Sequence, residues 1–511
     1  MKKITILTVL TLALLQSFAQ SKKLPKEIVL EKEIELTNSV FDKSFLEYYG
    51  LVLAFYNDSK DKNEAGKKTI EFKKYDIDLK EEFTNKIAIS KFLNFYEKAV
   101  DDEALYYLFS DRYNYSVLKY NFINNKITTY EGKLNYSGQL GVNNGMVSVF
   151  GENIPNQKVH KTVFWLTAPL LFTPMIFYPL KRVPVIHNID MSGENSTFLQ
   201  EHSLNYLKPK FFSFRAIQSN KELNELNFFA DYYNGSENKI SLRAIKDNKI
   251  SKDVYIKNTI PKTWIRPTNI KAINENEKLI LGEVNANKKE NNGLFVASIS
   301  NNKQNFFKGV QWKKLKTIGD LNVKNCNFEY TISKIIKKEG QTVFCLQIFY
   351  VLMKKSAVSN HYEFDANQYV GALMIAISDK GELLWDKSFK CDDVFSKTRI
   401  DKFGFCEIED GNYEITNHKG FAIDIITFNP SKNKTTTREV VINEEDRPEK
   451  QRKKIFGFGE TVFPGLKTEI FNWYDNVYIA MNEFEKTVEN ENGKKVKKKV
   501  LSFMKVESNQ Y

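Results

Sequence analysis

A histidine and two carboxylates alternate along one short segment, His361-Tyr-Glu363-Phe-Asp365. In an extended chain alternate side chains point to the same face, so His361, Glu363 and Asp365 would point together. An imidazole and two carboxylates suit several divalent metal ions. The segment is therefore a candidate metal site, placed in a predicted loop over residues 353–368. No second ligand cluster accompanies it, so a solvated loop that alternates by chance is the competing interpretation. The sequence predicts no cofactor.

A second unusual stretch is VFWLTAPLLFTPMIFYPLKRVPVI, residues 163–186, in which proline recurs every five positions and the first eighteen residues carry no charge. Prolines at this density break a membrane-spanning helix and exclude a central strand. We expect an extended apolar insertion that either packs over the fold or binds a partner or a lipid surface. The candidate binding residues are Trp165, Phe172, Phe177, Tyr178 and Arg182. We expect most of the stretch to be buried, with only its Tyr178–Arg182 end in solvent.

Motifs for catalysis are missing from the sequence. It contains no G-x-S-x-G, H-E-x-x-H or C-x-x-C pattern. Carboxylates are too numerous to select a catalytic pair, because acid–base work by two carboxyls depends on their separation in space. The sequence therefore assigns no catalytic residue and favours a binding protein over an enzyme.

The elements that would position these residues follow a recurring pattern of strand, tight polar turn, strand, longer loop, strand, turn and strand. The clearest copies are residues 269–312, 328–389 and 403–442, with weaker copies at 93–134 and 212–256. The first turns fall near residues 50, 102, 144, 222, 275, 339, 410 and 475. Four-stranded units at such a period predict an all-β protein, a β-propeller of about eight blades, with seven also possible. Tandem β-sandwich domains are the alternative, although no Pro-, Gly- or Ser-rich linker divides the chain.

The two ends of the chain predict how the ring closes. The last unit, residues 467–507, offers only three strands, whereas Glu27–Leu36 is a β-like segment without a unit of its own. Pairing this segment into the last unit would supply the missing fourth strand and remove a free edge.

The segment GALMIAISDKGELLWDKSF, residues 371–389, resembles the strand–turn–strand signature of exported bacterial β-propeller repeat proteins of uncharacterised function. In that signature an Asp/Gly turn is followed by a tryptophan that packs between blades. The resemblance covers one unit and implies the fold alone. It departs from the sialidase Asp-box, because Ser378 and Asp379 are adjacent here.

The first residues, MKKITILTVLTLALLQSFAQ, have the features of an export signal. Lys2 and Lys3 precede an apolar run, Ile4–Leu15, and Ser17-Phe-Ala19 is a small-x-small cleavage site. We therefore predict a signal peptide over residues 1–19 and a single propeller domain over 20–511, with the insertion at 163–186. The apolar run is too short to span a bilayer, and no cysteine follows it, so neither a transmembrane span nor a lipoprotein is expected. The protein would be periplasmic, cell-surface or secreted.

The net charge indicates which partners to consider, and the cysteine content indicates how many disulfides are possible. The formal net charge is +12. An exported protein rarely meets nucleic acid, so anionic glycans or an anionic membrane surface are the electrostatic partners to consider. The four cysteines, Cys326, Cys345, Cys391 and Cys406, allow one disulfide but do not indicate its pairing, and Cys345 lies in an apolar run typical of a buried free thiol.

The leading interpretation is an exported, non-enzymatic propeller that binds an envelope protein or an extracellular glycan. Both unusual stretches would follow the second strand of a unit, so they would lie on the rim that also carries the unit-to-unit connections. The alternatives are a propeller-type glycan hydrolase or lyase, and a structural component of an envelope assembly. A polar channel with clustered titratable groups would favour the enzyme.

Overall fold

The computed structural model describes residues 28–36, 39–57, 66–153, 183–204, 211–220, 223–233, 238–323, 327–355, 362–396, 399–418, 422–441, 467–475, 477–489 and 495–507. Their regular structure consists of strands β1–β33 and short 3₁₀ turns. These turns are η1 (Glu47–Tyr49), η3 (Lys289–Asn291), η4 (Trp312–Lys314), η5 (Ile318–Leu321) and η7 (Glu409–Gly411). No helix in the described part of the chain has the length and apolar character needed to span a bilayer.

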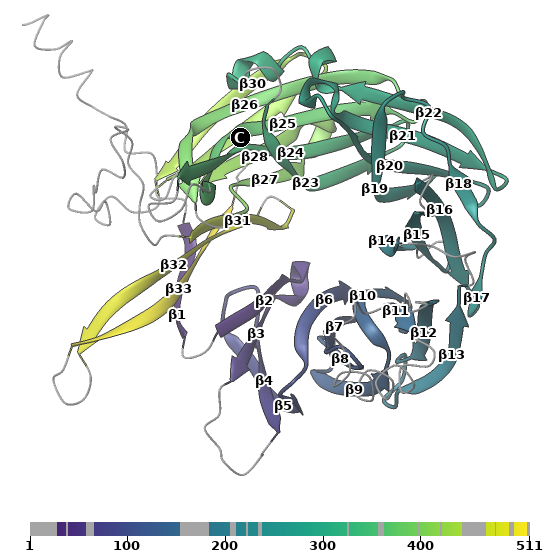
Figure 1. The fold of residues 1–511 in the computed structure, drawn as a ribbon. Coiled ribbons are helices and arrows are strands. Elements are labelled where there is room, and N and C mark those ends of the chain that lie inside the picture. The colour runs from purple at the N-terminus through teal and green to yellow at the C-terminus, as the bar shows by residue number, and fades with distance from the viewer. Residues whose placement is uncertain are drawn as a thin grey trace, which may run out of the picture.

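The strands form eight antiparallel sheets, arranged around a centre as the blades of a propeller (Figure 1). The first four blades contain β2 (Ser39–Phe45), β3 (Leu51–Asn57), β4 (Lys67–Tyr75) and β5 (Glu81–Ser90); β6 (Asn94–Val100), β7 (Ala104–Ser110), β8 (Asn114–Asn121) and β9 (Lys126–Lys133); β10 (Asn135–Asn143), β11 (Met146–Asn153), β12 (Val183–Asp190) and β13 (Thr197–Ser203); and β14 (Phe211–Asn220), β15 (Glu225–Tyr233), β16 (Asn238–Lys246), β17 (Lys249–Ile250) and β18 (Val254–Ile256).

The other four blades are built in the same way. They contain β19 (Thr263–Ala272), β20 (Glu277–Ala286), β21 (Gly293–Ser300) and β22 (Lys303–Gln311); β23 (Glu329–Lys338), β24 (Gln341–Lys355), β25 (Tyr362–Ser378) and β26 (Leu383–Ser396); β27 (Phe403–Glu407), β28 (Tyr413–His418), β29 (Ala422–Asn429) and β30 (Lys434–Val441); and β31 (Lys467–Tyr474), β32 (Val477–Glu489) and β33 (Lys495–Glu507) together with β1 (Ile28–Leu36). The first strand of each blade is the innermost, and we number the blades 1 to 8 in this order.

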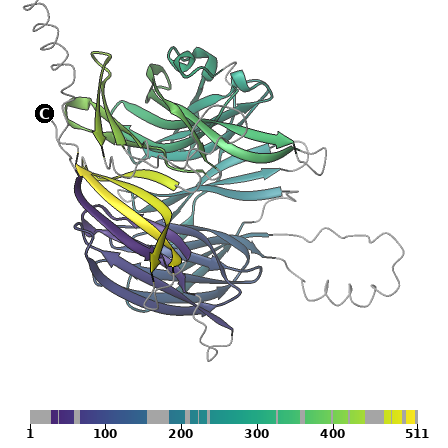
Figure 2. The same ribbon diagram turned by 90° about the vertical axis from the view of Figure 1, so that its left-hand side faces the viewer.

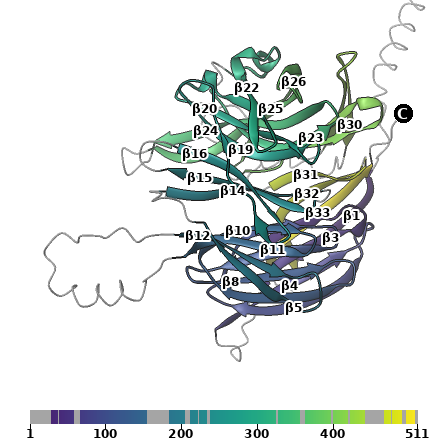
Figure 3. The ribbon, with the colours of Figure 1, turned by 90° about the vertical axis from the view of Figure 1, so that its right-hand side faces the viewer.

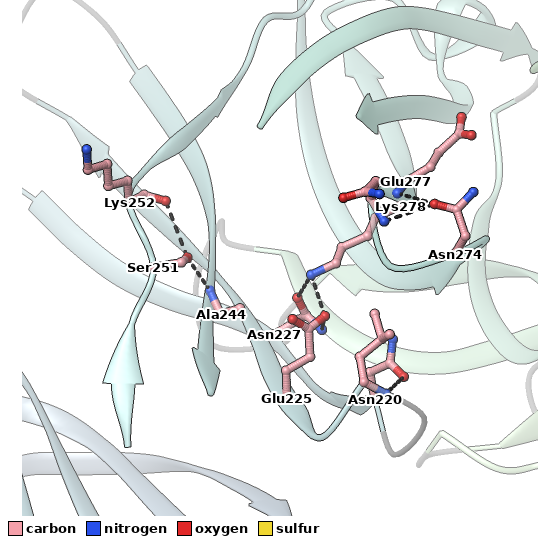
Figure 4. A network of polar contacts seen from close by, with 11 residues as sticks. Asn220, Glu225, Asn227, Ala244, Ser251, Lys252, Asn274, Glu277 and Lys278 are labelled. Atoms are coloured by element: carbon pink, nitrogen blue, oxygen red, sulfur yellow. Dashed lines mark hydrogen bonds and ion pairs between the residues drawn. The ribbon is translucent and has the colours of Figure 1, made fainter. Parts of the chain in front are cut away.

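In each blade the turn between the first and second strands lies where the sequence predicts it. The first turns of the eight blades lie at the predicted positions, from η1 beside residue 50 to the β31–β32 turn at residue 475. In blade 5 the side-chain oxygen of Asn274 accepts hydrogen bonds from the backbone N–H groups of Asn276 and Glu277, both at 2.9 Å (Figure 4). Such asparagine-capped turns explain why short polar segments separate the β-rich runs.

Apolar clusters fill the space between every pair of neighbouring blades, and this closes the ring. Eight clusters join blades 1 and 2, 2 and 3, and so on around to blades 8 and 1. The last of them packs Leu53 of β3 with Phe503 of β33, both fully buried. A single closed ring of eight blades therefore replaces the alternatives of seven blades or tandem sandwiches.

Between the blades a few polar contacts complement the apolar clusters. Lys278 of β20 donates a hydrogen bond to the side-chain oxygen of Asn227 on β15 at 3.0 Å and forms an ion pair with Glu225 (Figure 4). The tryptophan of the resembling segment, Trp385 on β26, packs on Tyr413 and Phe428 of blade 7, with ring centroids 5.5 Å apart in both pairs. The inter-blade position implied by the resemblance is therefore confirmed.

The predicted closing strand is also confirmed. β1 runs antiparallel to β33, with Ile34 opposite Leu501 and Leu36 opposite Lys499. β1 is the outermost strand of blade 8, beside strands from the other end of the chain (Figures 2 and 3). Half-buried Ile34 and Leu36 pack against the cluster between blades 8 and 1.

The prediction of a loop over residues 353–368 is wrong. β24 continues to Lys355 and β25 starts at Tyr362, so the two strands form a long hairpin. Their pairing shifts by one residue, because Leu352 faces Ala366 whereas Met353 faces Phe364. Asp365 is the extra residue of this bulge, which interrupts the simple alternation assumed for Glu363 and Asp365.

Residues 183–186, the end of the predicted insertion, belong to β12. Pro184 is the second residue of this strand. It still accepts a hydrogen bond from the Leu204 N–H at 2.9 Å, although it has no N–H of its own to donate. A proline is tolerated at the start of a strand, where fewer ladder bonds are lost.

Three cysteines, Cys345, Cys391 and Cys406, are buried, and Cys345 is a free thiol, as predicted. Burial raises the pKa of the Cys345 thiol to about 12, so it stays protonated. Cys326 lies outside the described residues.

Candidate functional site

A polar cavity of about 410 Å³ lies between the inner strands β19 and β23. Its lining residues are Arg266, Thr268, Asn269, Glu283, Tyr330, Thr331, Ile332, Ser333, Lys334, Ile335 and Arg399. We call it the channel pocket. Arg399 belongs to the connection from blade 6 to blade 7, Glu283 lies on β20, and the other members lie in the first or middle part of β19 and β23. Because turns alternate between the two ends of a meander, the pocket lies toward the rim that carries the blade-to-blade connections.

Three cations give this pocket its charge. The Arg266 side chain is 61% exposed and lies opposite Glu283 across the β19–β20 pair, with Nη1 3.8 Å from the Glu283 Oε2. Lys334 donates a hydrogen bond to the Phe405 carbonyl oxygen at 3.0 Å. The Arg399 guanidinium lies 5.7 Å from the centre of the Phe349 ring. Glu283 is the one carboxylate among the lining residues, so cations outnumber anions and an anionic ligand is favoured.

Burial raises the pKa of Glu283, while Arg266 and a hydrogen bond from Tyr330 oppose the shift. Burial also raises the pKa of Tyr330 far above its usual value, and the charge of Glu283 adds to this. Tyr330 therefore remains a protonated hydrogen-bond donor at neutral pH. Glycoside hydrolysis by the usual route needs two carboxyls across the scissile bond, whereas this pocket offers one.

Two polar atoms on the pocket wall have no hydrogen-bond partner among the described residues. They are Asn269 Oδ1 and Ser333 Oγ, and both are buried from solvent. Leaving buried polar atoms unsatisfied costs free energy, so such atoms call for a water molecule or a ligand group. Because neither atom is exposed to solvent, a ligand rich in hydroxyl groups would reach them only through a bridging water molecule or a shift of the wall.

Aromatic side chains surround the mouth of the channel on the same rim. Tyr96, Tyr136 and Trp264 are 55%, 40% and 50% exposed. Together with Tyr330 they occupy the second or third position of the inner strands β6, β10, β19 and β23. Exposed aromatic residues therefore recur at equivalent positions of three blades on this rim.

Most of the site residues predicted from sequence are not tested by the structure. Trp165, Phe172, Phe177, Tyr178 and Arg182 lie outside the described residues, and so does His361. Asp365 is half-buried on β25. Among the described residues, no three His, Cys, Asp or Glu side chains are grouped to hold a metal ion. The metal site with Glu363 and Asp365 therefore stays a prediction.

The two connections that were expected to share one rim do so by topology. One joins β11 to β12, and the other joins β24 to β25, the second and third strands of blades 3 and 6. Exposed Val351, Met353 and Phe364 lie near the end of the β24–β25 hairpin. The channel pocket therefore lies on the side of the ring that the sequence predicts as the working face.

A buried polar array occupies the interface between blades 2 and 3. The Tyr115 hydroxyl lies 3.0 Å from His187 Nδ1, and His187 Nε2 lies 3.2 Å from the Glu201 carboxylate. Because the carboxylate accepts, Nε2 carries the hydrogen and Nδ1 accepts from the tyrosine. Tyr115 is only 1% exposed, so no substrate reaches its hydroxyl. The array is therefore structural.

This array predicts a pH dependence of stability. Burial lowers the pKa of His187, although Glu201 opposes the shift. The unfolded chain, with a histidine pKa of about 6.5, then binds the proton more readily than the folded chain. The contribution of His187 to the free energy of unfolding is therefore fully present above about pH 6.5, and it falls as the pH drops below that value. In thermal melts from pH 7.5 to 5.5, His187→Gln should lose less Tm than wild type; parallel curves would contradict this.

Known proteins resemble this chain only distantly. No family model matches the chain, and no curated protein matches it. Among solved structures, an uncharacterized protein from Listeria monocytogenes EGD-e has a TM-score of 0.33 at 8% identity, covering 69% of this chain and 85% of its own. An acylaminoacyl peptidase from Pyrococcus horikoshii has a TM-score of 0.37 at 9% identity, covering 89% and 59%. The apocarotenoid oxygenase from Synechocystis has a TM-score of 0.29 at 8% identity, covering 51% and 61%.

At these scores the likenesses carry no argument about function. The fold assignment rests on the chain itself, whose eight antiparallel sheets, seven of them four-stranded, form a closed ring. The protein is thus an eight-bladed β-propeller.

Proposed function

We propose that this propeller is an exported binding protein that holds an acidic glycan in the channel pocket. The observation that carries the proposal is the convergence of Arg266, Lys334 and Arg399 on one polar cavity of about 410 Å³. That volume lies in the range of small-molecule sites. Guanidinium groups pair with carboxylate and sulfate oxygens by two parallel hydrogen bonds, which gives both affinity and orientation.

Several features favour a glycan over an acidic protein segment. The wall has hydroxyl and amide side chains, and the buried atoms Asn269 Oδ1 and Ser333 Oγ lack partners among the described residues. Sugars present many hydroxyl groups that can hydrogen-bond with the hydroxyl and amide side chains of such a wall. Trp264 and Tyr136 are exposed on this rim, and the flat apolar faces of sugar rings can stack on aromatic side chains. Export is supported by the N-terminal sequence, Lys2 to Ala19, which has the pattern of a signal peptide.

The alternative of a glycan hydrolase or lyase has narrower support. Glu283 and Tyr330 share the pocket and could exchange a proton with a bound sugar. A hydrolase would need a second carboxyl near the bond that breaks. Chromatography of the glycan after prolonged incubation would reveal cleavage, and intact glycan is the result we expect. The envelope-assembly alternative depends on the insertion, whose residues 163–182 lie outside the described part of the chain.

Calorimetric titration of the chain from Gln20 onward tests the proposal. The probes are trigalacturonate, its methyl ester and hexaglutamate. The acid should bind at least about tenfold more tightly than the uncharged ester, a difference of about 1.4 kcal/mol, because charge-assisted hydrogen bonds are lost on esterification. Its affinity should fall with added salt. Equal affinity for acid and ester would contradict the proposal, and tighter binding of hexaglutamate would favour a protein partner.

A further inference from the structure

We infer that the mouth of this propeller binds an extended acidic polysaccharide at two separate places, the channel pocket and a second patch on blades 2 and 3. The second patch consists of Tyr96, Arg112, Tyr113 and Tyr136. The inference rests on the proposed function and specifies its ligand as a chain of several sugar units.

The second patch is held together by direct contacts. The Arg112 guanidinium lies 5.6 Å from the centre of the Tyr136 ring and 5.5 Å from that of the Tyr113 ring. A Cβ built on Gly138 would lie 3.6 Å from Tyr96 Cδ1, so the Tyr96 ring packs over this glycine of the neighbouring blade. The patch therefore joins the inner strands β6 and β10 with the turn between β7 and β8.

Backbone strain at Tyr136 is an independent observation that points to a ligand. Its φ is +50°, a left-handed conformation that is unfavourable for a bulky residue. The Tyr136 N–H donates a hydrogen bond to the Arg112 carbonyl oxygen at 3.3 Å, which holds the strained residue beside the arginine. Such strained residues gather at binding sites, where the strain positions a side chain. Here the strained residue is one whose ring remains 40% exposed at the channel mouth.

The second patch has the same chemistry as the pocket. Trp264, which is not a lining residue of the pocket, lies two residues before Arg266 on β19, and Tyr330, which is one, lies on the same strand as Lys334. In the patch, Tyr136 lies against Arg112. A ring face for the apolar side of a sugar and a cation for its acidic group therefore occur at both places. A polysaccharide with an acidic group on every unit would present the same pair of features repeatedly along its length.

The position of the two places sets the length of the ligand. The patch belongs to blades 2 and 3, whereas the pocket lies between blades 5 and 6, with blade 4 between them. Face-to-face sheets pack about 10 Å apart, so the two places are separated by on the order of 20 Å. One sugar cannot reach both, but a chain can. Linking two weak contacts through one ligand raises affinity without any new type of contact.

Titration with galacturonate oligomers of two lengths tests this inference. The probes are the disaccharide and a chain of about twelve units. Wild type should bind the long chain at least about tenfold more tightly than the disaccharide. Tyr136→Ala and Arg112→Gln should remove most of that gain and leave the disaccharide unaffected, whereas Arg399→Gln should weaken both. Tyr255→Ala, which changes an exposed tyrosine on the outer strand β18, is the matched control and should change neither.

The outcomes separate the two proposals. If the disaccharide binds and the patch variants leave the long chain unaffected, the second patch is refuted while the pocket stands. If neither oligomer binds, both proposals are refuted. Melting curves of Tyr136→Ala and Arg112→Gln show whether each variant is folded. Because the two substitutions are at different positions, a local structural change at one of them does not decide the result.

Discussion

Deletion of Ile28–Leu36 should destabilise the whole ring and expose a strand edge. β1 covers β33, and its half-buried Ile34 and Leu36 pack on the cluster that joins blades 8 and 1. Their loss exposes Leu501 and Phe503 of β33, which are fully buried in the intact ring. At about 25 cal/mol per Å² of apolar surface, we expect a loss of at least about 3 kcal/mol in the free energy of unfolding. The open edge should also promote self-association.

A point variant separates the effect of losing the β1 packing from the effect of shortening the chain. Ile34→Asp introduces a charge on the packed face of β1, whereas Glu33→Gln changes an exposed neighbour on the other face. Denaturant unfolding should show a marked loss for Ile34→Asp and a change within about 0.5 kcal/mol for Glu33→Gln. Unchanged stability of both the deletion and Ile34→Asp would refute the role of β1 in closing the ring.

Removing two charges from the channel pocket should have the largest effect on binding. In the double variant Arg266→Gln, Arg399→Gln, trigalacturonate should lose two charge-assisted hydrogen bonds. Hydrogen bonds to charged groups contribute about 1.5–3 kcal/mol each, so affinity should fall by roughly a hundredfold or more. Both side chains are exposed, so the free energy of unfolding should change little.

The matched control removes the same charge elsewhere. Lys432 and Lys434 are exposed at the turn between β29 and β30, on the opposite rim and away from the channel. The double variant Lys432→Gln, Lys434→Gln should retain wild-type affinity. A similar loss in both double variants would mean that net charge, and no particular site, attracts the glycan.

Much of the fold follows from local sequence patterns. Turn chemistry such as Asn274 and Gly340 marks each first turn, and the unpaired segment before Leu36 predicts the closing strand. These features can be predicted locally, because a turn residue fixes the backbone only of the few residues next to it in the sequence. The β24–β25 hairpin was missed for a related reason. Its outer half has a mixed polar and apolar composition, and only pairing across the sheet extends the strands to Lys355 and Tyr362.

The channel pocket could not be predicted in the same way. Arg266 and Lys334 come from blades 5 and 6 and Arg399 from the connection to blade 7, and they meet only because the ring brings inner strands together. No local pattern links them. A weaker signal was available, since an aromatic residue recurs at the second or third position of several inner strands, as in Trp264 and Tyr330. Aligning the repeats on their first turns would have found it.

The most direct test of the account is a crystal structure of the chain from Gln20 onward with bound trigalacturonate. We predict the sugar between β19 and β23, with a carboxylate within hydrogen-bond distance of Arg266 or Arg399 and a hydroxyl on Ser333 or Asn269. Sugar bound instead to the insertion around Trp165 and Tyr178, with the channel pocket holding only water, would contradict it.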